Sequence, residues 1–296
     1  MEAHVDPDDY LRIGQLPELR SPFFLVAFAG WNDAGQVATH ALTSLVTAWA
    51  AERCAEIDSE EFFDFTESRP LISLDPTGRR SLVWPGNVLF WHQLPHAQHD
   101  VVILVGTEPQ LRWRTFCGTI LHLAGRLDAC CLVTLGGFLA DVPHTIEPRI
   151  TGFVSSSDLL PQLQALRLRV STYEGPTGIT GALHDAWEQT ERPAISLWGS
   201  VPHYISASPN PQISLALLQR VGLILQTELP TSGLQAQEAA FRTQVEEALR
   251  DNPEASEYVH ELETHYRDEP TPSPGPELIA ELEEFLRNRR PTDEAE

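Results

Sequence analysis

The sequence predicts an α/β protein built around a mostly parallel β-sheet. From Pro22 to about Leu229, short apolar runs alternate with longer stretches of helical periodicity, which is typical of stacked βα units. The first run, residues 23–29, is apolar without interruption, as expected of a strand buried on both faces. The chain has 296 residues, of which 42% are hydrophobic and 21% charged, so it can bury a sizeable core and is neither disordered nor a coiled coil.

The core elements follow from these two patterns. The first strand precedes a helix over residues 33–52, in which Val37, Ala41 and Leu45 recur at helical spacing. The remaining predicted strands are 100–106, 129–135 and 194–198, and the remaining predicted helices are 111–127, 159–168, 179–191 and 211–226. We assign residues 1–230 to this α/β core domain.

Residues 60–99 interrupt the alternation of strands and helices. Four short β-rich pieces, separated by Pro, Gly and Asp turns, cover residues 62–65, 71–74, 81–84 and 87–91. We expect this insertion to form β-hairpins that are added to the sheet.

Residues 231–296 differ in character from the core. They contain 17 acidic and 6 basic side chains and so carry −11 of the net charge of −22. Helices are predicted over residues 232–250, 253–266 and 277–290, with a proline-rich linker at 270–276. The first of them has an apolar stripe made of Leu234, Phe241, Val245 and Leu249. This acidic helical region is expected either to lie over a site in the core as a lid or to extend outward and bind a partner.

The charge balance excludes several classes of protein. The chain has 42 acidic and 20 basic residues, and every basic residue is arginine. A surface this negative repels phosphate backbones and anionic membranes, so nucleic acid and membrane are not expected partners. Without lysine, the chain lacks the residue needed for a Schiff base, for a P-loop and for the strand lysine of a kinase.

A cytoplasmic location is expected from the sequence. No apolar stretch approaches the roughly 20 residues of a membrane-spanning helix, and the N-terminal residues are acidic and polar, unlike an export signal. The cysteines have no metal-ligand spacing and are expected to be reduced thiols in the core: Cys54, Cys117, Cys130 and Cys131.

Polar and glycine-rich segments follow the predicted strands at the points where they end. The most distinctive is Gly30 to Gly35, between the first strand and its helix. In open α/β sheets ligands bind at this carboxyl edge, where helix N-termini present unpaired N–H groups. We therefore predict a ligand-binding crevice lined by Trp31, Asn32, Asp33, Glu108, Gly136, Gly137, Thr177, Gly178, Ser200, His203 and Asn210.

A purely structural role for the same residues stays open, because helix caps and tight turns also need Asn, Asp and Gly. Asp33, Glu108 and His203 are one candidate set of acid, base and orienting group. Ser200 lacks the second flanking glycine of a nucleophile elbow. No catalytic residue is therefore assigned.

Three histidines raise the question of a metal site. His92, His96 and His99 are spaced by four and three residues, which on a helix would suggest zinc. Pro95 lies inside this run and favours a loop instead. We therefore expect neither a metal nor a cofactor.

Four motifs together resemble the bacterial (actinobacterial) branch of the proteasome assembly chaperone family of the second type. They are Ala-Gly-Trp-Asn-Asp-Ala-Gly at 29–35, Gly-Thr-Glu-Pro at 106–109, residues 175–181, and Trp-Gly-Ser-Val-Pro-His-Tyr at 198–204 with Pro-Asn-Pro at 209–211. The resemblance covers roughly residues 22–230. It implies an αβα sandwich similar to that of purine nucleoside phosphorylases, an inserted hairpin, a homotrimer and no established catalytic residues.

Relatives in that family engage proteasome α-subunits, in part through a C-terminal tail of hydrophobic residue, tyrosine and any residue. The sequence here ends Pro-Thr-Asp-Glu-Ala-Glu at 291–296, so binding through such a tail is not expected.

These observations support two hypotheses of function. The first is a non-enzymatic, cytoplasmic, homotrimeric scaffold or assembly factor that binds protein partners, with proteasome subunits among them. The alternative is a small-molecule-binding protein or enzyme of the phosphorylase or hydrolase type. Its crevice would lie at the carboxyl edge of the sheet under the C-terminal helices.

Overall fold

The computed structural model describes residues 6–75, 77–155, 168–171, 173–205 and 209–268. Its strands are β1 (Leu11–Ile13), β2 (Phe23–Ala29), β3 (Glu52–Ile57), β4 (Leu71–Leu74), β5 (Arg80–Val83), β6 (Asn87–His92), β7 (Val101–Thr107), β8 (Cys131–Ala140), β9 (Ile150–Val154), β10 (Arg169–Val170) and β11 (Ala194–Pro202). Its helices are η1 (Pro7–Tyr10), η2 (Ala34–Gln36), α1 (Val37–Trp49), α2 (Trp113–Arg126), α4 (Ile179–Glu188), α5 (Pro211–Leu225), α6 (Ser232–Arg250) and α7 (Pro253–Asp268).

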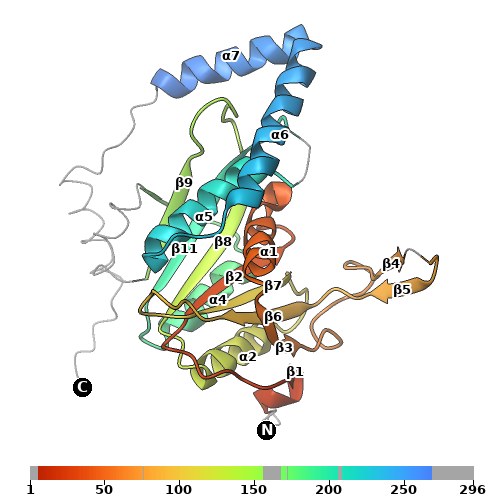
Figure 1. Cartoon of the computed structure of the whole chain (residues 1–296), viewed down its shortest axis with the longest axis vertical. Helices are drawn as coiled ribbons and strands as arrows, with labels where there is room; N and C mark the ends of the chain where they lie inside the picture. Colours follow the sequence, from red (N-terminus) through yellow and green to blue (C-terminus); the bar gives the residue numbers. More distant parts are fainter. Residues whose placement is uncertain (1–5, 76, 156–167, 172, 206–208, 269–296) are drawn as a thin grey trace, which may run out of the picture.

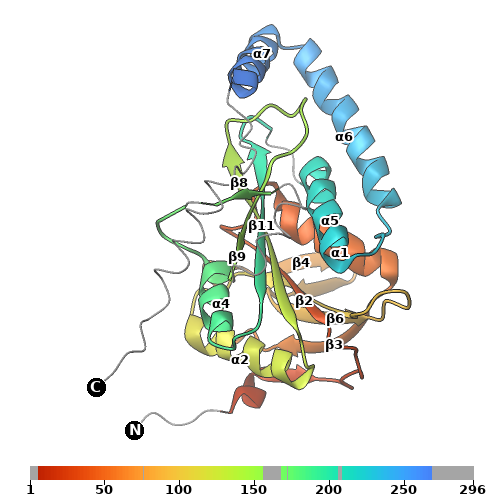
Figure 2. The same ribbon diagram turned by 90° about the vertical axis from the view of Figure 1, so that its left-hand side faces the viewer.

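Nine strands form one sheet in the order β1-β3-β6-β7-β2-β8-β11-β9-β10. The central strands β7, β2, β8 and β11 are parallel, and antiparallel pairs flank them on both sides. Helices α1 and α5 cover one face of the sheet and α2 and α4 cover the other (Figures 1 and 2). This is the predicted α/β fold, an αβα sandwich around a large, mostly parallel sheet.

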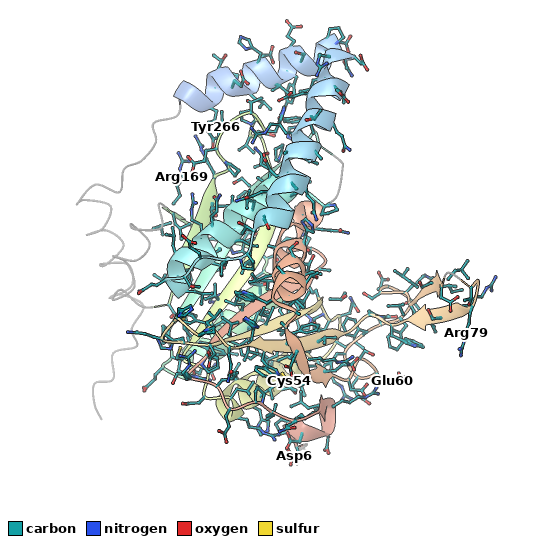
Figure 3. The ribbon with its side chains drawn as sticks, in the orientation of Figure 1. Asp6, Cys54, Glu60, Arg79, Arg169 and Tyr266 are labelled. Atoms are coloured by element: carbon teal, nitrogen blue, oxygen red, sulfur yellow. The ribbon has the colours of Figure 1, made fainter. Side chains whose placement is uncertain are left out.

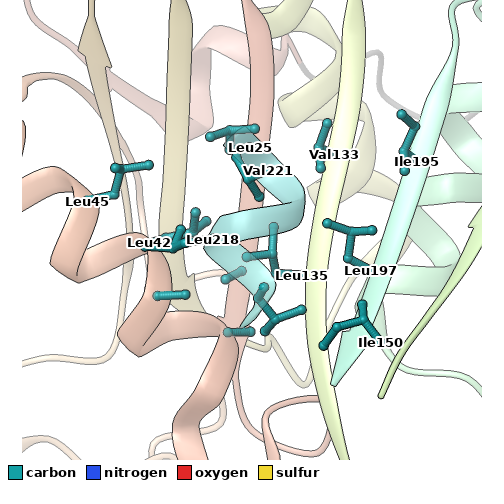
Figure 4. Packing of buried hydrophobic residues seen from close by; sticks show 14 of the residues in the cluster. Leu25, Leu42, Leu45, Val133, Leu135, Ile150, Ile195, Leu197, Leu218 and Val221 are labelled. Atoms are coloured by element: carbon teal, nitrogen blue, oxygen red, sulfur yellow. The ribbon is translucent and has the colours of Figure 1, made fainter. Parts of the chain in front are cut away.

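Strand β2 shows why its apolar run is uninterrupted. Leu25 and Ala27 face α1 and α5, whereas Phe24, Val26 and Phe28 face α2 and α4, and all five are at most 2% exposed. Side chains of β2, β8 and β11 pack in the same way against Leu42 of α1 and Leu218 and Val221 of α5 (Figure 4). A central parallel strand has no solvent face, so both of its faces are apolar.

The carboxyl ends of β8 and β11 extend beyond the predicted ends at residues 135 and 198. The two strands pair in parallel from Leu132 with Ala194 to Ala140 with Pro202. The sequence at Gly136 and Gly137 suggests a turn, yet both glycines lie within β8. A Cβ on Gly136 would lie 2.6 Å from the Trp198 ring and one on Gly137 would lie 2.4 Å from Val37. These glycines therefore serve close packing within the sheet and not chain reversal.

The prediction of a strand over residues 62–65 is wrong. This segment forms turns, and its Phe62 ring packs 5.2 Å from the rings of both Tyr10 and Phe116. Aromatic residues are enriched in strands because they fill a buried surface, and here they fill the core from a loop. Strands β1, β3, β9 and β10 lie towards the two sides of the sheet. They were not predicted, because their apolar runs are short or interrupted by polar residues and glycine.

Within the described part of the insertion, residues 60–75 and 77–99, only β6 joins the main sheet, antiparallel to β7. Strands β4 and β5 instead form a separate two-stranded sheet that projects from the body of the molecule (Figure 1). The expectation that all the inserted hairpins extend the sheet is therefore corrected.

Helix α6 lies along α5, with Leu234 and Phe241 buried and Val245 and Leu249 half-buried. Helix α7 turns away from it at the top of Figure 1. The helix predicted over residues 159–168 lies almost wholly outside the described residues, and so do the linker at 270–276 and the helix at 277–290. No helix in the described ranges has the length and apolar character needed to cross a bilayer.

Candidate functional site

The loops that follow β2 and β7 meet the N-terminus of α4. Asn32 Nδ2 donates to Glu108 Oε1 at 3.3 Å, and the Ile179 backbone N–H donates to the same oxygen at 2.7 Å. Gly178 lies between them: a Cβ there would be 2.0 Å from Asn32 Nδ2 and 2.5 Å from Glu108 Oε1. A carboxylate at a helix N-terminus is stabilised by the helix dipole. We refer to Asn32, Glu108 and Gly178 as the strand-end cluster.

Asp33 anchors the start of α1. Its carboxylate accepts from Ala38 N at 2.7 Å, from Thr39 N at 3.4 Å and from the Thr39 hydroxyl. Burial raises the pKa of Asp33, and the hydrogen bonds from Thr39 and Ala38 oppose that rise. Asp33 therefore caps the N-terminus of α1. This is the purely structural role that the sequence left open for it.

Other predicted crevice residues connect these loops to the rest of the edge. Gly137 N donates to Asn32 O at 2.8 Å, and Asn210 N donates to Gly35 O at 2.9 Å. Asn210 also caps α5, because its Oδ1 accepts from Ile213 N at 3.2 Å. Thr177 precedes Gly178, and its hydroxyl lies 3.5 Å from the Gly178 carbonyl oxygen. In contrast to these residues, Trp31 is 65% exposed.

His203 and Ser200 belong to a second group, at the far end of β11. The Nδ1 atom of His203 faces Asp141 Oδ1 at 3.0 Å and Ala140 O at 3.3 Å, so Nδ1 carries the hydrogen and donates a hydrogen bond to these acceptors. The Nε2 atom is 3.3 Å from the Tyr258 hydroxyl of α7. His203 therefore connects the core to a C-terminal helix.

Ser200 lines a small hollow of about 10 Å³ beneath the end of α7, and Tyr266 also lines it. Figure 3 shows Tyr266 at this end of α7. The Arg149 guanidinium lies 3.2 Å from the centre of the Tyr266 ring. Ligand pockets usually have volumes of about 300–1,000 Å³, so this hollow is too small for a drug-sized ligand.

The loop beside this hollow is tied to the core and to α7. The Tyr204 hydroxyl accepts from His144 N at 2.8 Å and lies 2.7 Å from His144 Nδ1, and burial raises the pKa of Tyr204 to about 12. The Thr145 hydroxyl donates to Glu263 of α7 at 2.5 Å.

The candidate acid, base and orienting group have different partners in the structure. Asp33 binds the start of α1, Glu108 binds the start of α4, and His203 contacts Asp141 and Tyr258. The hydrogen bonds of the described residues thus do not join the three into one catalytic set.

Sequence reasoning missed a buried polar network behind the strand ends. His184 Nε2 of α4 is 2.7 Å from the Thr134 hydroxyl, which donates to Ser196 Oγ at 3.1 Å, and Trp198 Nε1 donates to the same oxygen at 2.7 Å. Burial lowers the pKa of His184 to about 4. The members of this network lie far apart along the chain, so no local pattern in the sequence marks them as a group.

The histidines of the insertion take structural roles. The His92 ring stacks on Trp49 with centroids 4.9 Å apart, and His99 Nδ1 lies 2.9 Å from Ser21 O. No group of three or more metal-binding side chains occurs within the described ranges. The four cysteines are free thiols, and burial raises the pKa of Cys54 to about 11 and that of Cys117 to about 12.

The geometry defines a three-layer αβα protein in which the loops at the carboxyl edge are held closed by hydrogen bonds. The PAC2 family matches residues 27–249, and the chain belongs to this family. The resemblance inferred from the sequence motifs is thereby confirmed.

Solved structures support the same assignment. A PAC2 family protein from Streptomyces avermitilis and a proteasome-assembly chaperone homologue from Mycobacterium tuberculosis are each 38% identical to this chain, covering 80% of it and 99% of the other chain, with TM-scores of 0.73 and 0.72. A Mycobacterium tuberculosis protein of unknown function shares the fold at 24% identity, covering 97% of this chain and 99% of the other with a TM-score of 0.80. No curated protein sequence matches the chain.

Proposed function

We propose that this protein is an assembly factor that binds other proteins, with proteasome subunits as its partners. The observation that carries the proposal is membership of the PAC2 family, together with 38% identity to a proteasome-assembly chaperone homologue. The proposal also includes a homotrimeric state and a cytoplasmic location, where unassembled proteasome subunits are found.

The surface chemistry is consistent with protein binding. Trp31 is a large aromatic side chain, 65% exposed, beside the rigid strand-end cluster. Tryptophan is enriched among the residues that contribute most to protein interfaces. The net charge of −22 favours partners with basic surfaces and accelerates their encounter. In this proposal, the acidic helices α6 and α7 present negative charge to the partner.

The small-molecule alternative is not favoured. Asn32, Asp33 and Glu108, which would have to bind a ligand, are already engaged with the chain itself. The hollow at Ser200 is small for a ligand. We therefore propose that the polar residues at the strand ends shape a rigid surface and do not carry out a reaction.

The test is reconstitution with purified proteasome α- and β-subunits of the source organism. The protein is mixed with each unassembled subunit at physiological salt, and complexes are weighed by native mass spectrometry. We expect a stoichiometric complex with one subunit type and faster appearance of assembly intermediates. The absence of any complex at micromolar concentration would overturn the proposal.

A pair of variants makes the test specific. Trp31→Ala removes the exposed aromatic side chain of the strand-end loops and is expected to weaken binding at least tenfold, the order expected of an interface hot spot. Leu223→Ala removes a side chain of α5 that is 56% exposed and is expected to leave binding unchanged. Equal binding by both variants would mean that Trp31 is not part of the contact.

A further inference from the structure

The β4–β5 hairpin exposes an unusual amount of apolar surface. We define the hairpin arm as residues 69–84, of which the structure describes all but residue 76. Six large apolar side chains of the arm are 50–69% exposed: Leu71, Ile72, Leu74, Leu82, Val83 and Trp84. Contiguous exposed apolar surface of this kind marks an interaction site.

The apolar residues occupy both faces of the arm. Leu71 is directly opposite Val83, and Ile72 is directly opposite Leu82. Opposed residues share a face and successive residues alternate, so each face carries one aliphatic pair. A two-stranded sheet is marginally stable in water by itself. The arm therefore gains stability from a surface that covers it.

The arm is nevertheless held in a defined shape. At its tip, Asp75 Oδ1 accepts from the backbone N–H groups of Thr77 and Arg79, both at 2.9 Å. At its base, the Trp84 ring packs edge-on against Phe65 at 4.7 Å. The surface that the arm presents is thus organised before any partner arrives, which lowers the entropic cost of binding.

The charge of the arm is opposite to that of the rest of the chain. The arm contains Arg69, Arg79 and Arg80 against Asp75, a net charge of +2, whereas the remainder of the chain carries −24. No ion pair engages these three arginines within the described ranges. A second copy of this chain therefore offers the arm the acidic surface that matches it, while the bodies of two copies repel each other.

We propose that the hairpin arm of one copy docks onto the acidic body of a second copy and is the contact that joins the protomers. Apolar side chains on the arm become covered, and the arginines at its tip meet carboxylates. Because the arm and its receiving surface are different parts of the chain, the contact is head-to-tail, and with the threefold rotation of the proposed homotrimer it closes into a ring. This inference rests on the self-association proposed above and specifies the surface responsible for it.

The experiment is sedimentation velocity and native mass spectrometry of the full chain across a hundredfold range of concentration. Ile72→Ser with Leu82→Ser removes one aliphatic pair, and Arg79→Glu with Arg80→Glu reverses the charge at the tip. Leu223→Ser is the matched control, since Leu223 is also exposed and apolar but lies on α5. We expect both double variants to dissociate at least tenfold more readily, towards the 33.0 kDa protomer, and the control to match the wild type.

The possible outcomes test two hypotheses separately: that the chain forms an oligomer, and that the hairpin arm is the contact between its protomers. Wild-type masses in both double variants, or equal dissociation of the control, would overturn the arm as the contact while leaving an oligomer in place. A monomeric wild type at tens of micromolar would overturn the arm proposal and the homotrimer together, without bearing on proteasome binding. Loss of proteasome-subunit binding with no change in mass would mean that the arm contacts a foreign protein, which also contradicts the proposal. Because the altered side chains are exposed, unchanged circular dichroism is expected for every variant.

Discussion

Acidification is expected to destabilise this protein through His184. The imidazole is buried between α4 and the sheet, with Nε2 at 2.7 Å from the Thr134 hydroxyl. Its Nδ1 atom has no hydrogen-bond partner among the described residues, and the Phe153 ring packs against it. An imidazolium here would lose its hydration without gaining an anion, which is why burial lowers the pKa of His184 to about 4.

The direction of the effect follows from proton binding in the two states. An unfolded histidine has a pKa of about 6.5, above the folded value of about 4. Between these values the unfolded chain binds the proton and the folded chain does not, so stability falls as the pH falls through this window. Between pH 7.5 and pH 5, protonation of this one group lowers the free energy of unfolding by about 2 kcal/mol. Below pH 4 the loss of stability levels off at about 3 kcal/mol, because both states are then protonated.

The assay is urea unfolding, followed by tryptophan fluorescence, at several pH values between 7.5 and 5. His184→Gln removes the titrating group, so its free energy of unfolding is expected to fall by about 2 kcal/mol less than that of the wild type over this range. His96→Gln is the matched control because His96 is exposed, and its pH dependence is expected to follow the wild type. Identical pH dependence of His184→Gln and the wild type would refute the assignment.

Three further substitutions test the packing of the strand ends and of α6 by urea unfolding at pH 7.5. Glu108→Gln keeps the side-chain shape but removes the charge that binds the start of α4, and is expected to cost about 1–2 kcal/mol. Gly178→Ala places a Cβ 2.0 Å from Asn32 Nδ2 and is expected to cost about 1–3 kcal/mol. Phe241→Ala removes a buried anchor of α6 and is expected to cost about 3 kcal/mol. The exposed Leu223→Ala serves as control, expected to stay within about 0.5 kcal/mol of the wild type, and a target variant within the same limit would contradict its contact.

The elements with the strongest periodicity were predicted closely. Helix α2 was expected over residues 111–127 and spans Trp113–Arg126, and α6 was expected over 232–250 and spans Ser232–Arg250. Both repeat apolar residues at helical spacing over several turns, so the pattern depends on local spacing alone. The strand prediction at 62–65 was wrong because the phenylalanines there are buried by residues distant in the sequence. Residue composition alone does not distinguish a strand from a loop whose side chains fill the core.

The strand-end residues were predicted as a group, but their contacts were not. Residue types and positions after predicted strands were enough to select Asn32, Glu108 and Gly178. Their hydrogen bonds show that they close the edge of the sheet on itself. Ser200 and His203 were selected by the same reasoning, yet the extra length of β11 carries them to a separate group beneath α7.

The sequence by itself determined the fold class, the order of the central elements and the family, because apolar periodicity and short motifs are properties of neighbouring residues. Only the tertiary structure decided which polar groups meet. Asn32 and Glu108 are 76 residues apart, and Thr134 and His184 are 50 apart. Strand register and helix packing bring such pairs within hydrogen-bonding distance, and no local pattern in the chain encodes that proximity. The same is true of the hairpin arm, whose β-rich sequence was evident while its exposure was set by its separation from the main sheet.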